Sequence, residues 1–206
     1  MPPEYKVVYF NLRGRGELLR LLLHAAGVQF VDQRVEFADW PSLKSSTPEG
    51  TLPYMVIGGK EYGESMPLAR YIARKYSLMG ISELDQLNAD IILNHIDDIR
   101  NAVSRARNDK SLTEDQKKEI EAKAMTELLP KLLRRMETRL TENKHGYLIG
   151  NILSIADLAF FDLLETSLKE IHNLLENFPK IREHRKRIET YPRISKYLAT
   201  RPDTKI

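Results

Sequence analysis

The sequence predicts a small α/β domain followed by an all-helical domain. Over residues 1–76, short β-rich apolar runs alternate with helical spacings of apolar residues, which is typical of an α/β fold. Beyond residue 84, nearly every segment repeats apolar residues at helical intervals, which indicates amphipathic helices. The two predicted domains therefore span residues 1–76 and 85–206, and a linker over residues 77–84 joins them.

The first domain is predicted to alternate strands and helices that are separated by glycine-rich turns. Gly14 and Gly16 predict a tight loop after the first strand, and Gly27 ends the first helical pattern. Gly58-Gly59 lies between two short strand patterns and predicts a β-hairpin. The predicted elements are, in chain order, strand 6–10, helix 18–26, strand 30–36, an irregular segment 40–48, strands 54–57 and 60–62, and a helix from Ser65 to Tyr76.

The second domain is predicted to contain two long helices followed by shorter ones. Pro130 lies inside the second long helix, which runs over about residues 113–141, and should kink it without ending it because the apolar pattern resumes beyond the proline. Ser154 and Asp157 match a capping box before an apolar run. Shorter helices are predicted over 181–190 and 192–199. The first long helix carries one predicted apolar stripe, formed by Leu87, Ile91, Ile92, Ile96 and Ile99.

Composition excludes several classes of protein. The 206-residue chain has 32 basic and 29 acidic residues, and its densest basic run, residues 184–187, is interpreted as a solvated helix face rather than a nucleic-acid site. No apolar run approaches the ~20 residues that a membrane span needs. The absence of cysteine excludes disulfides, and the scattered histidines do not predict a metal site. The N-terminal residues do not resemble a signal peptide, so a cytoplasmic protein is expected.

Tyr9 and Arg15 are the first candidate functional residues. Tyr9 ends the first predicted strand, and ligands of open α/β sheets bind outside the carboxyl ends of strands. Its phenol could donate a hydrogen bond to an anion, and the permanent charge of Arg15 could support the same site. A core tyrosine and a surface arginine are the alternative interpretations.

Three further segments offer hydrogen-bonding groups to a small acidic peptide. A cis bond before Pro53 is plausible and would leave the backbone of Leu52 free to bind a peptide as an added strand. Ser65 is a good N-cap, and a helix N-terminus also binds carboxylates. Trp40 and Lys44 carry donors suited to a carboxylate. An ordinary trans turn and a plain helix cap remain the alternatives.

Taken together, the order and spacing of these segments resemble the glutathione transferases, and most closely their sigma class. The resemblance covers essentially the whole chain. The matching segments are Tyr9 to Arg15, Asp39-Trp40-Pro41 with Lys44, Leu52-Pro53, residues 64–65 with 69–74, the capping box at 154–157 and the ending 201–206.

The resemblance implies a thioredoxin-like first domain, an all-α second domain and a homodimer that uses glutathione as co-substrate and requires no metal. It implies that Tyr9, supported by Arg15, activates the glutathione thiol for transfer to small hydrophobic electrophiles, a detoxification reaction. Asp98 would reach the glutathione of the neighbouring subunit, although a solvated helix face is its simpler interpretation. The implied glutathione-binding residues are Tyr9, Arg15, Trp40, Lys44, Leu52, Pro53, Glu64, Ser65 and Asp98.

Two positions depart from the family pattern. Glu64 stands where the family usually has Gln, and an ionised carboxylate only accepts hydrogen bonds. Arg105 replaces an aromatic residue of the prostaglandin-isomerising members, so it disfavours their activity. A glutathione-dependent prostaglandin D synthase activity and a non-catalytic, crystallin-like binding role remain alternatives to conjugation. The implied electrophile pocket consists of Phe10, Leu12, Arg13, Gly14, Arg105, Ala159 and Leu163.

Overall fold

The computed structural model describes residues 4–204, except the side chain of residue 170, and contains two compact units. The first unit includes the chain up to Met79 and also the segment from Ile188 onward. The second unit runs from Gly80 to Arg187. The last helix of the chain is therefore grouped with the first unit.

A four-stranded sheet in the order β2-β1-β3-β4 organises the first unit. The central strand β1 pairs in parallel with β2 and antiparallel with β3, and β3 pairs antiparallel with β4. This arrangement contains all four strands that the sequence predicts. Their bounds are β1 Tyr5–Phe10, β2 Phe30–Val35, β3 Tyr54–Ile57 and β4 Lys60–Tyr62.

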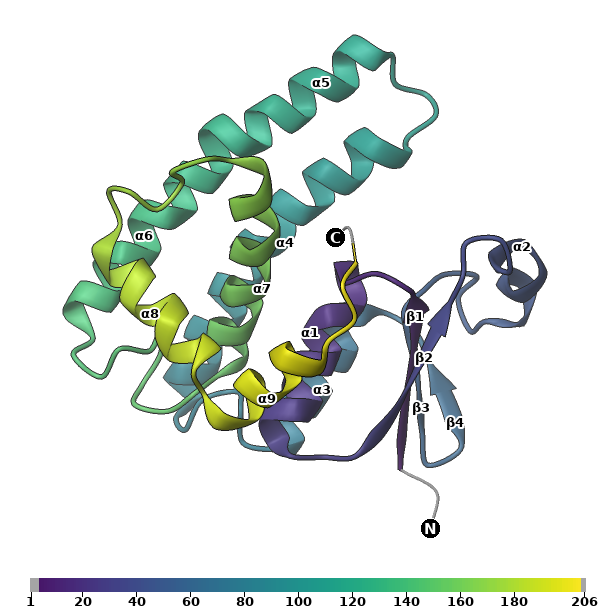
Figure 1. Cartoon of the computed structure of the whole chain (residues 1–206), viewed down its shortest axis with the longest axis horizontal. Helices are drawn as coiled ribbons and strands as arrows, with labels where there is room; N and C mark the ends of the chain where they lie inside the picture. The colour runs from purple at the N-terminus through teal and green to yellow at the C-terminus, as the bar shows by residue number, and fades with distance from the viewer. Residues whose placement is uncertain (1–3, 205–206) are drawn as a thin grey trace. The chain divides into compact units, whose positions relative to one another are not determined.

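Two helices of the first unit pack together beside the sheet (Figure 1). They are α1, Gly14–Ala26, and α3, Ser65–Lys75. As predicted, Gly27 ends α1, and its left-handed φ of 72° directs its N–H group to the carbonyl of His24. The helix α9, Pro192–Thr200, also contacts α1. The first unit therefore comprises a sheet and the helices that pack against it.

The segment predicted to be irregular forms helical turns instead. The short helix α2, Trp40–Leu43, is followed by a 3₁₀ turn over Lys44–Ser46. Pro41 lies in the first turn of α2, where the missing N–H group costs no hydrogen bond. A proline at this position favours the start of a helix, which explains why the segment is helical and not irregular.

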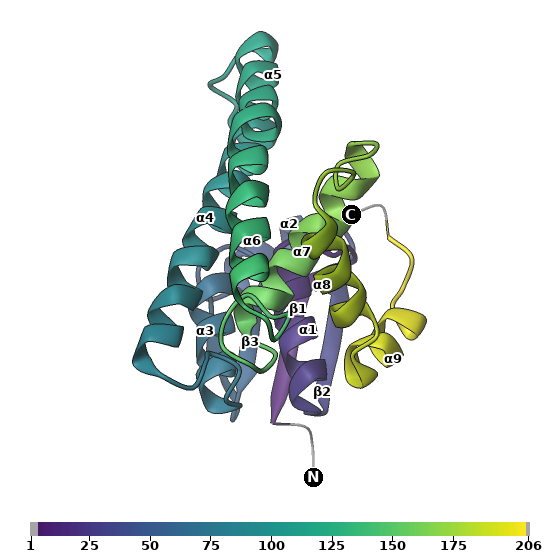
Figure 2. The ribbon, with the colours of Figure 1, turned by 90° about the vertical axis from the view of Figure 1, so that its left-hand side faces the viewer.

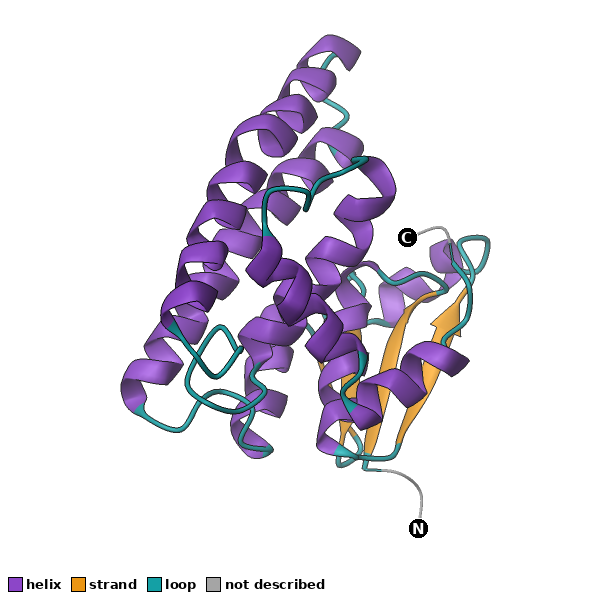
Figure 3. Ribbon diagram, turned by 60° about the vertical axis from the view of Figure 1, so that its left-hand side comes forward, coloured by secondary structure: helices purple, strands orange, loops and turns teal. Residues whose placement is uncertain are grey.

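The described regular elements of the second unit are all helices, and Figure 3 shows strands only in the first unit. In Figure 2, α5 and α6 form one continuous rod beside α4. A π-helical turn over Ala124–Leu128 joins them just before Pro130, so the prediction that the helix continues through Pro130 is confirmed. The helices are α4 Glu83–Asn108, α5 Glu114–Lys123, α6 Leu129–Glu142, α7 Ile155–Glu170 and α8 Pro179–Glu189, whose last residues lie beyond Arg187.

The apolar stripe predicted on α4 is only partly correct. Ile92, Ile96 and Ile99 are buried, but Leu87 is 55% exposed and Ile91 is 39% exposed. The buried residues repeat at intervals of three and four, whereas Leu87 and Ile91 fall on the neighbouring helix face. The exposed part of the stripe is thus a separate apolar surface.

Candidate functional site

The predicted segments leave the sheet at one end. Phe10, the last residue of β1, pairs with Val35 at the end of β2. On the other side, Val8 lies opposite Tyr54, so continuing the antiparallel register brings Leu52 level with Phe10. Because β4 runs antiparallel to β3, α3 also begins at this end. The fold therefore gathers the candidate residues of the first unit beside the carboxyl end of β1.

The Tyr9 hydroxyl lies at the N-terminus of α1. Its oxygen accepts a hydrogen bond of 3.1 Å from the backbone N–H group of Arg15, and the Tyr9 residue is 8% exposed. The first N–H groups of a helix have no partner within the helix, and the dipole makes this end positive. The contact therefore favours negative charge at or beside the phenol oxygen.

Two glycines in the first turn of α1 allow this approach. A Cβ atom at Gly16 would lie 2.5 Å from Cδ1 of Tyr9, and one at Gly14 would lie 2.7 Å from the Tyr9 hydroxyl oxygen. Gly14 also has a φ of 40°, which favours glycine. The sequence predicted that both glycines form a loop, but they belong to α1 because the helix must pass close to the tyrosine ring.

The bond between Leu52 and Pro53 is cis, which decides between the cis bond and the trans turn that the sequence left open. Pro53 is buried and Leu52 is half-buried. Within residues 4–204, the backbone N–H and C=O groups of Leu52 make no hydrogen bond. This stretch of backbone could therefore pair with an extended peptide.

Ser65 is the first residue of α3, not its N-cap as the sequence suggested. Glu64 occupies the N-cap position with a φ of 66° and no capping bond from its side chain. The first bond within the helix runs from the N–H group of Leu68 to the carbonyl of Glu64, and Pro67 has no N–H group. In the described chain, the N–H groups of Ser65 and Met66 donate no hydrogen bond. This helix end is suited to a carboxylate.

Trp40 and Lys44 lie one helical turn apart, since the Lys44 N–H group bonds to the Trp40 carbonyl. The Trp40 ring meets Phe10 edge-on at 5.5 Å between centroids. Phe10 also stacks on Phe37 at 4.5 Å, and Phe37 is 64% exposed. Sequence reasoning missed Phe37, although an exposed aromatic residue between a strand and a helix is a usable signal.

The remaining site residues differ in burial. In the first unit, Arg13 is 3% exposed and Leu12 is half-buried. On α4 of the second unit, Asp98 is exposed, and Arg105 places its Nε atom 3.5 Å from Oδ2 of Asp109. Ala159 and Leu163 on α7 are 0% and 5% exposed. These two side chains contribute little surface, so their place in an electrophile pocket stays a prediction.

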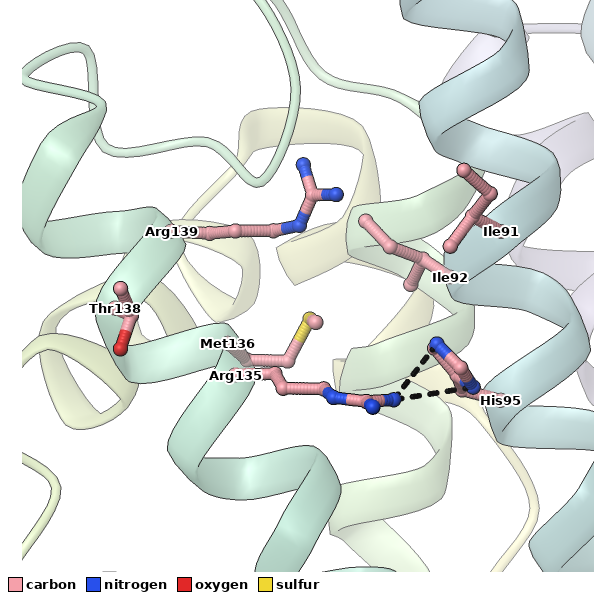
Figure 4. A pocket seen from close by; sticks show the side chains of 7 residues that line it. All are labelled: Ile91, Ile92, His95, Arg135, Met136, Thr138 and Arg139. Atoms are coloured by element: carbon pink, nitrogen blue, oxygen red, sulfur yellow. Dashed lines mark hydrogen bonds between the residues drawn. The ribbon is translucent and has the colours of Figure 1, made fainter.

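A separate cavity of about 300 Å³ lies between α4 and α6 (Figure 4). There, Nη1 of Arg135 approaches Nε2 of His95 at 2.9 Å. It contains none of the predicted site residues. The lining residues are Ile91, Ile92, His95, Arg135, Met136, Thr138 and Arg139.

The described residues form neither a metal cluster nor a membrane-spanning helix. Among residues 4–204, no group of three or more His, Cys, Asp or Glu side chains is arranged to hold a metal ion. No helix in the same range combines the length and the apolar character that crossing a bilayer requires.

Comparison with known proteins identifies the family. The model for the N-terminal domain of glutathione S-transferase matches residues 5–74, and the model for the C-terminal domain matches residues 97–201. Hematopoietic prostaglandin D synthase of Mus musculus is 32% identical over 205 residues, covering 99% of this chain and 100% of that protein. S-crystallin 4 of Enteroctopus dofleini is 32% identical over 214 residues, covering 98% of this chain and 99% of that protein.

The fold agrees with these matches. The solved sigma-class glutathione S-transferase of Fasciola hepatica has a TM-score of 0.85 and 29% identity, and the alignment covers 98% of each chain. The predicted fold class, a thioredoxin-like unit with a four-stranded sheet followed by a helical part, is confirmed. Both family models and relatives matched over nearly their whole length therefore show that this chain belongs to the glutathione S-transferase family.

Proposed function

We propose that this chain transfers the thiolate of glutathione to small hydrophobic electrophiles, a detoxification reaction. The hydrogen bond from the Arg15 N–H group to the Tyr9 hydroxyl oxygen carries this proposal. A donor at that oxygen makes the phenol proton more acidic and hence a better donor to the sulfur. Tyr9 stays protonated and stabilises the thiolate, and the Arg15 side chain adds positive charge.

The required stabilisation is within reach of this pair. A thiol has a pKa of about 8.5, so only a few per cent is ionised at neutral pH. Lowering that pKa by about two units needs roughly 2.7 kcal/mol. One charge-assisted hydrogen bond contributes about 1.5–3 kcal/mol. A single well-placed phenol therefore suffices in magnitude.

The rest of the tripeptide is proposed to bind along the same end of the sheet. The N–H groups at the start of α3, with Ser65, would hold one carboxylate, and Trp40 with Lys44 the other. The Leu52-Pro53 segment would pair with the peptide backbone. The electrophile pocket is proposed to comprise Phe10, Leu12, Arg13, Gly14, Arg105, Ala159 and Leu163.

The decisive assay is conjugation of glutathione to an activated aryl halide, together with retention on immobilised glutathione. We expect retention and a conjugation rate well above the uncatalysed reaction. Retention without conjugation would support the crystallin-like binding role instead. Failure of both would contradict any glutathione-dependent function.

The prostaglandin D synthase alternative shares the thiolate site and is favoured by the similarity to the Mus musculus protein. The Arg105 side chain, 66% exposed and paired with Asp109, opposes it because it supplies charge and not an aromatic surface. Supplying a prostaglandin endoperoxide with glutathione discriminates between the two functions. A D-type product formed faster than the aryl conjugate would favour the isomerase.

The chain is also proposed to act as a cytoplasmic homodimer, with Asp98 reaching the glutathione of the second subunit. Exposed apolar residues at the start of α4, with Leu84 at 70% and Leu87 at 55%, support an interface there. A monomeric mass in sedimentation equilibrium would contradict the homodimer.

Replacing Glu64 with Gln should tighten glutathione binding about two- to fivefold, since a charge near a helix N-terminus contributes roughly 0.3–1 kcal/mol. The exposed Glu64 carboxylate precedes the N–H groups proposed to bind a carboxylate, so it repels the ligand. Calorimetric titration at low and high salt measures the effect, which salt should diminish. Glu61→Gln on the exposed strand β4 is the matched control. Weaker binding by Glu64→Gln would instead assign Glu64 to the ligand ammonium.

Replacing Gly16 with Ala should lower kcat/KM for conjugation by about 10- to 100-fold, because displacing a catalytic group by about 1 Å costs up to that much. The added methyl group would overlap the Tyr9 ring, so the ring must move. Steady-state kinetics and thermal unfolding measure activity and folding separately. In the control Gly50→Ala, the new Cβ meets nothing within 4 Å, but the φ of 61° strains an alanine, so thermal stability should fall while activity per folded molecule persists. Full activity in Gly16→Ala would contradict the conclusion that the close approach of Gly16 to the Tyr9 ring positions the hydroxyl.

A further inference from the structure

A cluster of buried charges lies behind Tyr9 in the first unit. Arg20 and Glu17 on α1 are both 0% exposed. The Nε atom of Arg20 donates to Oδ1 of Asp32 on β2 at 2.9 Å, and its Nη1 atom lies 3.4 Å from Oε2 of Glu17. Burying charges is costly, and apolar residues of similar volume often stabilise a fold as well. Stability alone therefore does not explain why these charged residues are buried here.

The C-terminal segment completes this cluster. Both carboxylate oxygens of Glu17 accept from the Tyr197 hydroxyl at 3.0 Å, and Nη1 of Arg201 donates to Oε1 at 2.9 Å. Burial, and next the charge of Glu17, raises the pKa of Tyr197, so this hydroxyl stays protonated and donates. The Glu17 charge is thus held by partners from α9 as well as from its own helix.

Arg20 contacts both the turn that leads from Tyr9 to Arg15 and the ring of Tyr9. Its Nη1 atom donates to the carbonyl oxygen of Leu12 at 2.8 Å, in the turn that leads from Tyr9 to Arg15. Its Cζ atom lies 5.9 Å from the centroid of the Tyr9 ring, within cation–π range. The buried Nη2 atom of Arg20 makes no hydrogen bond to the described chain.

The cluster carries a net positive charge. The charged and titratable groups around Arg20 include Tyr9 on β1, Glu17 on α1, Asp32 and Arg34 on β2, Tyr197 on α9 and Arg201 beyond it. His24 on α1 stacks on Tyr197, and burial lowers its pKa, so it adds no charge at neutral pH. With Arg20 itself, three guanidinium groups oppose two carboxylates. A positive charge buried beside a phenol stabilises any anion that the phenol contacts, because the surroundings screen it weakly.

We propose that Arg20 is a positioning residue for thiolate formation, fixing the turn between Tyr9 and Arg15 and supplying positive charge behind the Tyr9 ring. This inference rests on the proposed function, in which Tyr9 contacts the sulfur. Arg20 itself lies behind the ring and acts through Tyr9. The pKa of the bound thiol is the property that a merely structural role would leave unchanged.

The test compares two replacements of similar length. Arg20→Gln keeps hydrogen-bonding capacity but loses the charge, and Arg20→Lys keeps the charge. The ultraviolet absorbance of the glutathione thiolate, titrated with each protein, reports the pKa of the bound thiol. We expect Arg20→Gln to raise it by about one unit, from about 6.5 to about 7.5. The thiolate fraction at pH 7, and with it kcat/KM, should then fall about threefold, and the loss should approach tenfold below about pH 6. In Arg20→Lys the thiol pKa should stay near the native value.

Arg201→Met is the matched control. Arg201 bonds to the same Glu17 carboxylate, but it lies beyond α9 and is not part of the contact between Arg20 and the turn from Tyr9 to Arg15. It should lower thermal stability and raise the thiol pKa by clearly less than Arg20→Gln does, because it removes one cation of the cluster but keeps the contacts of Arg20 with the Leu12 carbonyl and the Tyr9 ring. Equal thiol pKa values in Arg20→Gln and the native chain, or equal shifts in Arg20→Gln and Arg201→Met, would overturn the inference.

A further variant keeps the test decisive if Arg20→Gln does not fold. Arg34→Gln removes a second cation, which donates to Asp32 at 2.9 Å. It should raise the thiol pKa by a smaller amount, and an unchanged value would overturn the inference. Tyr9→Phe, titrated in parallel, tests the proposed function separately: a low native thiol pKa that rises only in Tyr9→Phe would retain the function and reject the role of Arg20.

Discussion

Replacing Tyr9 with Phe should reduce kcat/KM for conjugation by about 10- to 100-fold at neutral pH, the equivalent of one charge-assisted hydrogen bond. The ring and its packing against Gly16 remain, so only the hydroxyl that accepts from Arg15 is lost. Glutathione binding should persist, because the groups proposed to hold its carboxylates and backbone are unchanged. Steady-state kinetics and calorimetric titration measure the two effects.

The matched control for that variant is Tyr62→Phe. Tyr62 lies on β4 in the same unit and is 46% exposed, so the loss of its hydroxyl should leave kcat/KM unchanged. Full turnover in Tyr9→Phe would contradict the proposed hydrogen bond from the Tyr9 hydroxyl to the glutathione thiolate. A loss of glutathione binding equal to the loss of turnover would assign Tyr9 to binding alone.

Replacing Asp157 with Ala should cost about 3–5 kcal/mol of unfolding free energy, the usual cost of breaking a buried ionic and hydrogen-bonded group. Asp157 is 0% exposed and accepts from the N–H group of Leu148 at 2.7 Å, the N–H group of Ser154 at 2.8 Å and the Ser154 hydroxyl at 2.6 Å. The Nε2 atom of His184 lies 2.8 Å from the same carboxylate, and His184 is buried, so the prediction of a solvated face over residues 184–187 is wrong for this residue. Without the Asp157 carboxylate, several buried donors lose their partner. Denaturant unfolding measures the resulting loss of unfolding free energy.

A second capping box provides the control. Asp85 accepts from the N–H group of Ser82 at 3.0 Å, but this box lies at the surface. Asp85→Ala should therefore cost only about 1 kcal/mol, as for an ordinary cap. Equal losses in both variants would contradict the assignment of the larger effect to burial. Activity per folded molecule should survive in both, since neither residue belongs to the proposed site.

Local patterns predict most of the fold. The strands, the end of α1 at Gly27 and the capping box at Ser154 depend on neighbouring residues, so the sequence displays them directly. The effect of Pro130 is also local, because it acts on its own turn of helix. The start of α3 at Ser65 was predicted correctly, but the N-cap is Glu64 and not Ser65, and the left-handed φ of 66° at Glu64 is uncommon for a residue other than glycine.

Long-range contacts explain what the sequence does not display. Glu17 and Tyr197 are 180 residues apart, so no pattern announces that they meet or that Arg20 lies behind Tyr9. The sequence does not show why position 16 needs a glycine, because the reason is the Tyr9 ring that packs against it in the folded chain. The segments of the glutathione site are visible in the sequence, but their meeting at one end of the sheet follows only from the strand register.

Titration of the thiol of glutathione bound to the native protein, followed by thiolate absorbance, tests the central proposal most directly. We predict an apparent pKa about two units below the value of about 8.5 for a free thiol. A bound thiol that titrates as the free one does would contradict thiolate stabilisation by Tyr9 and Arg15.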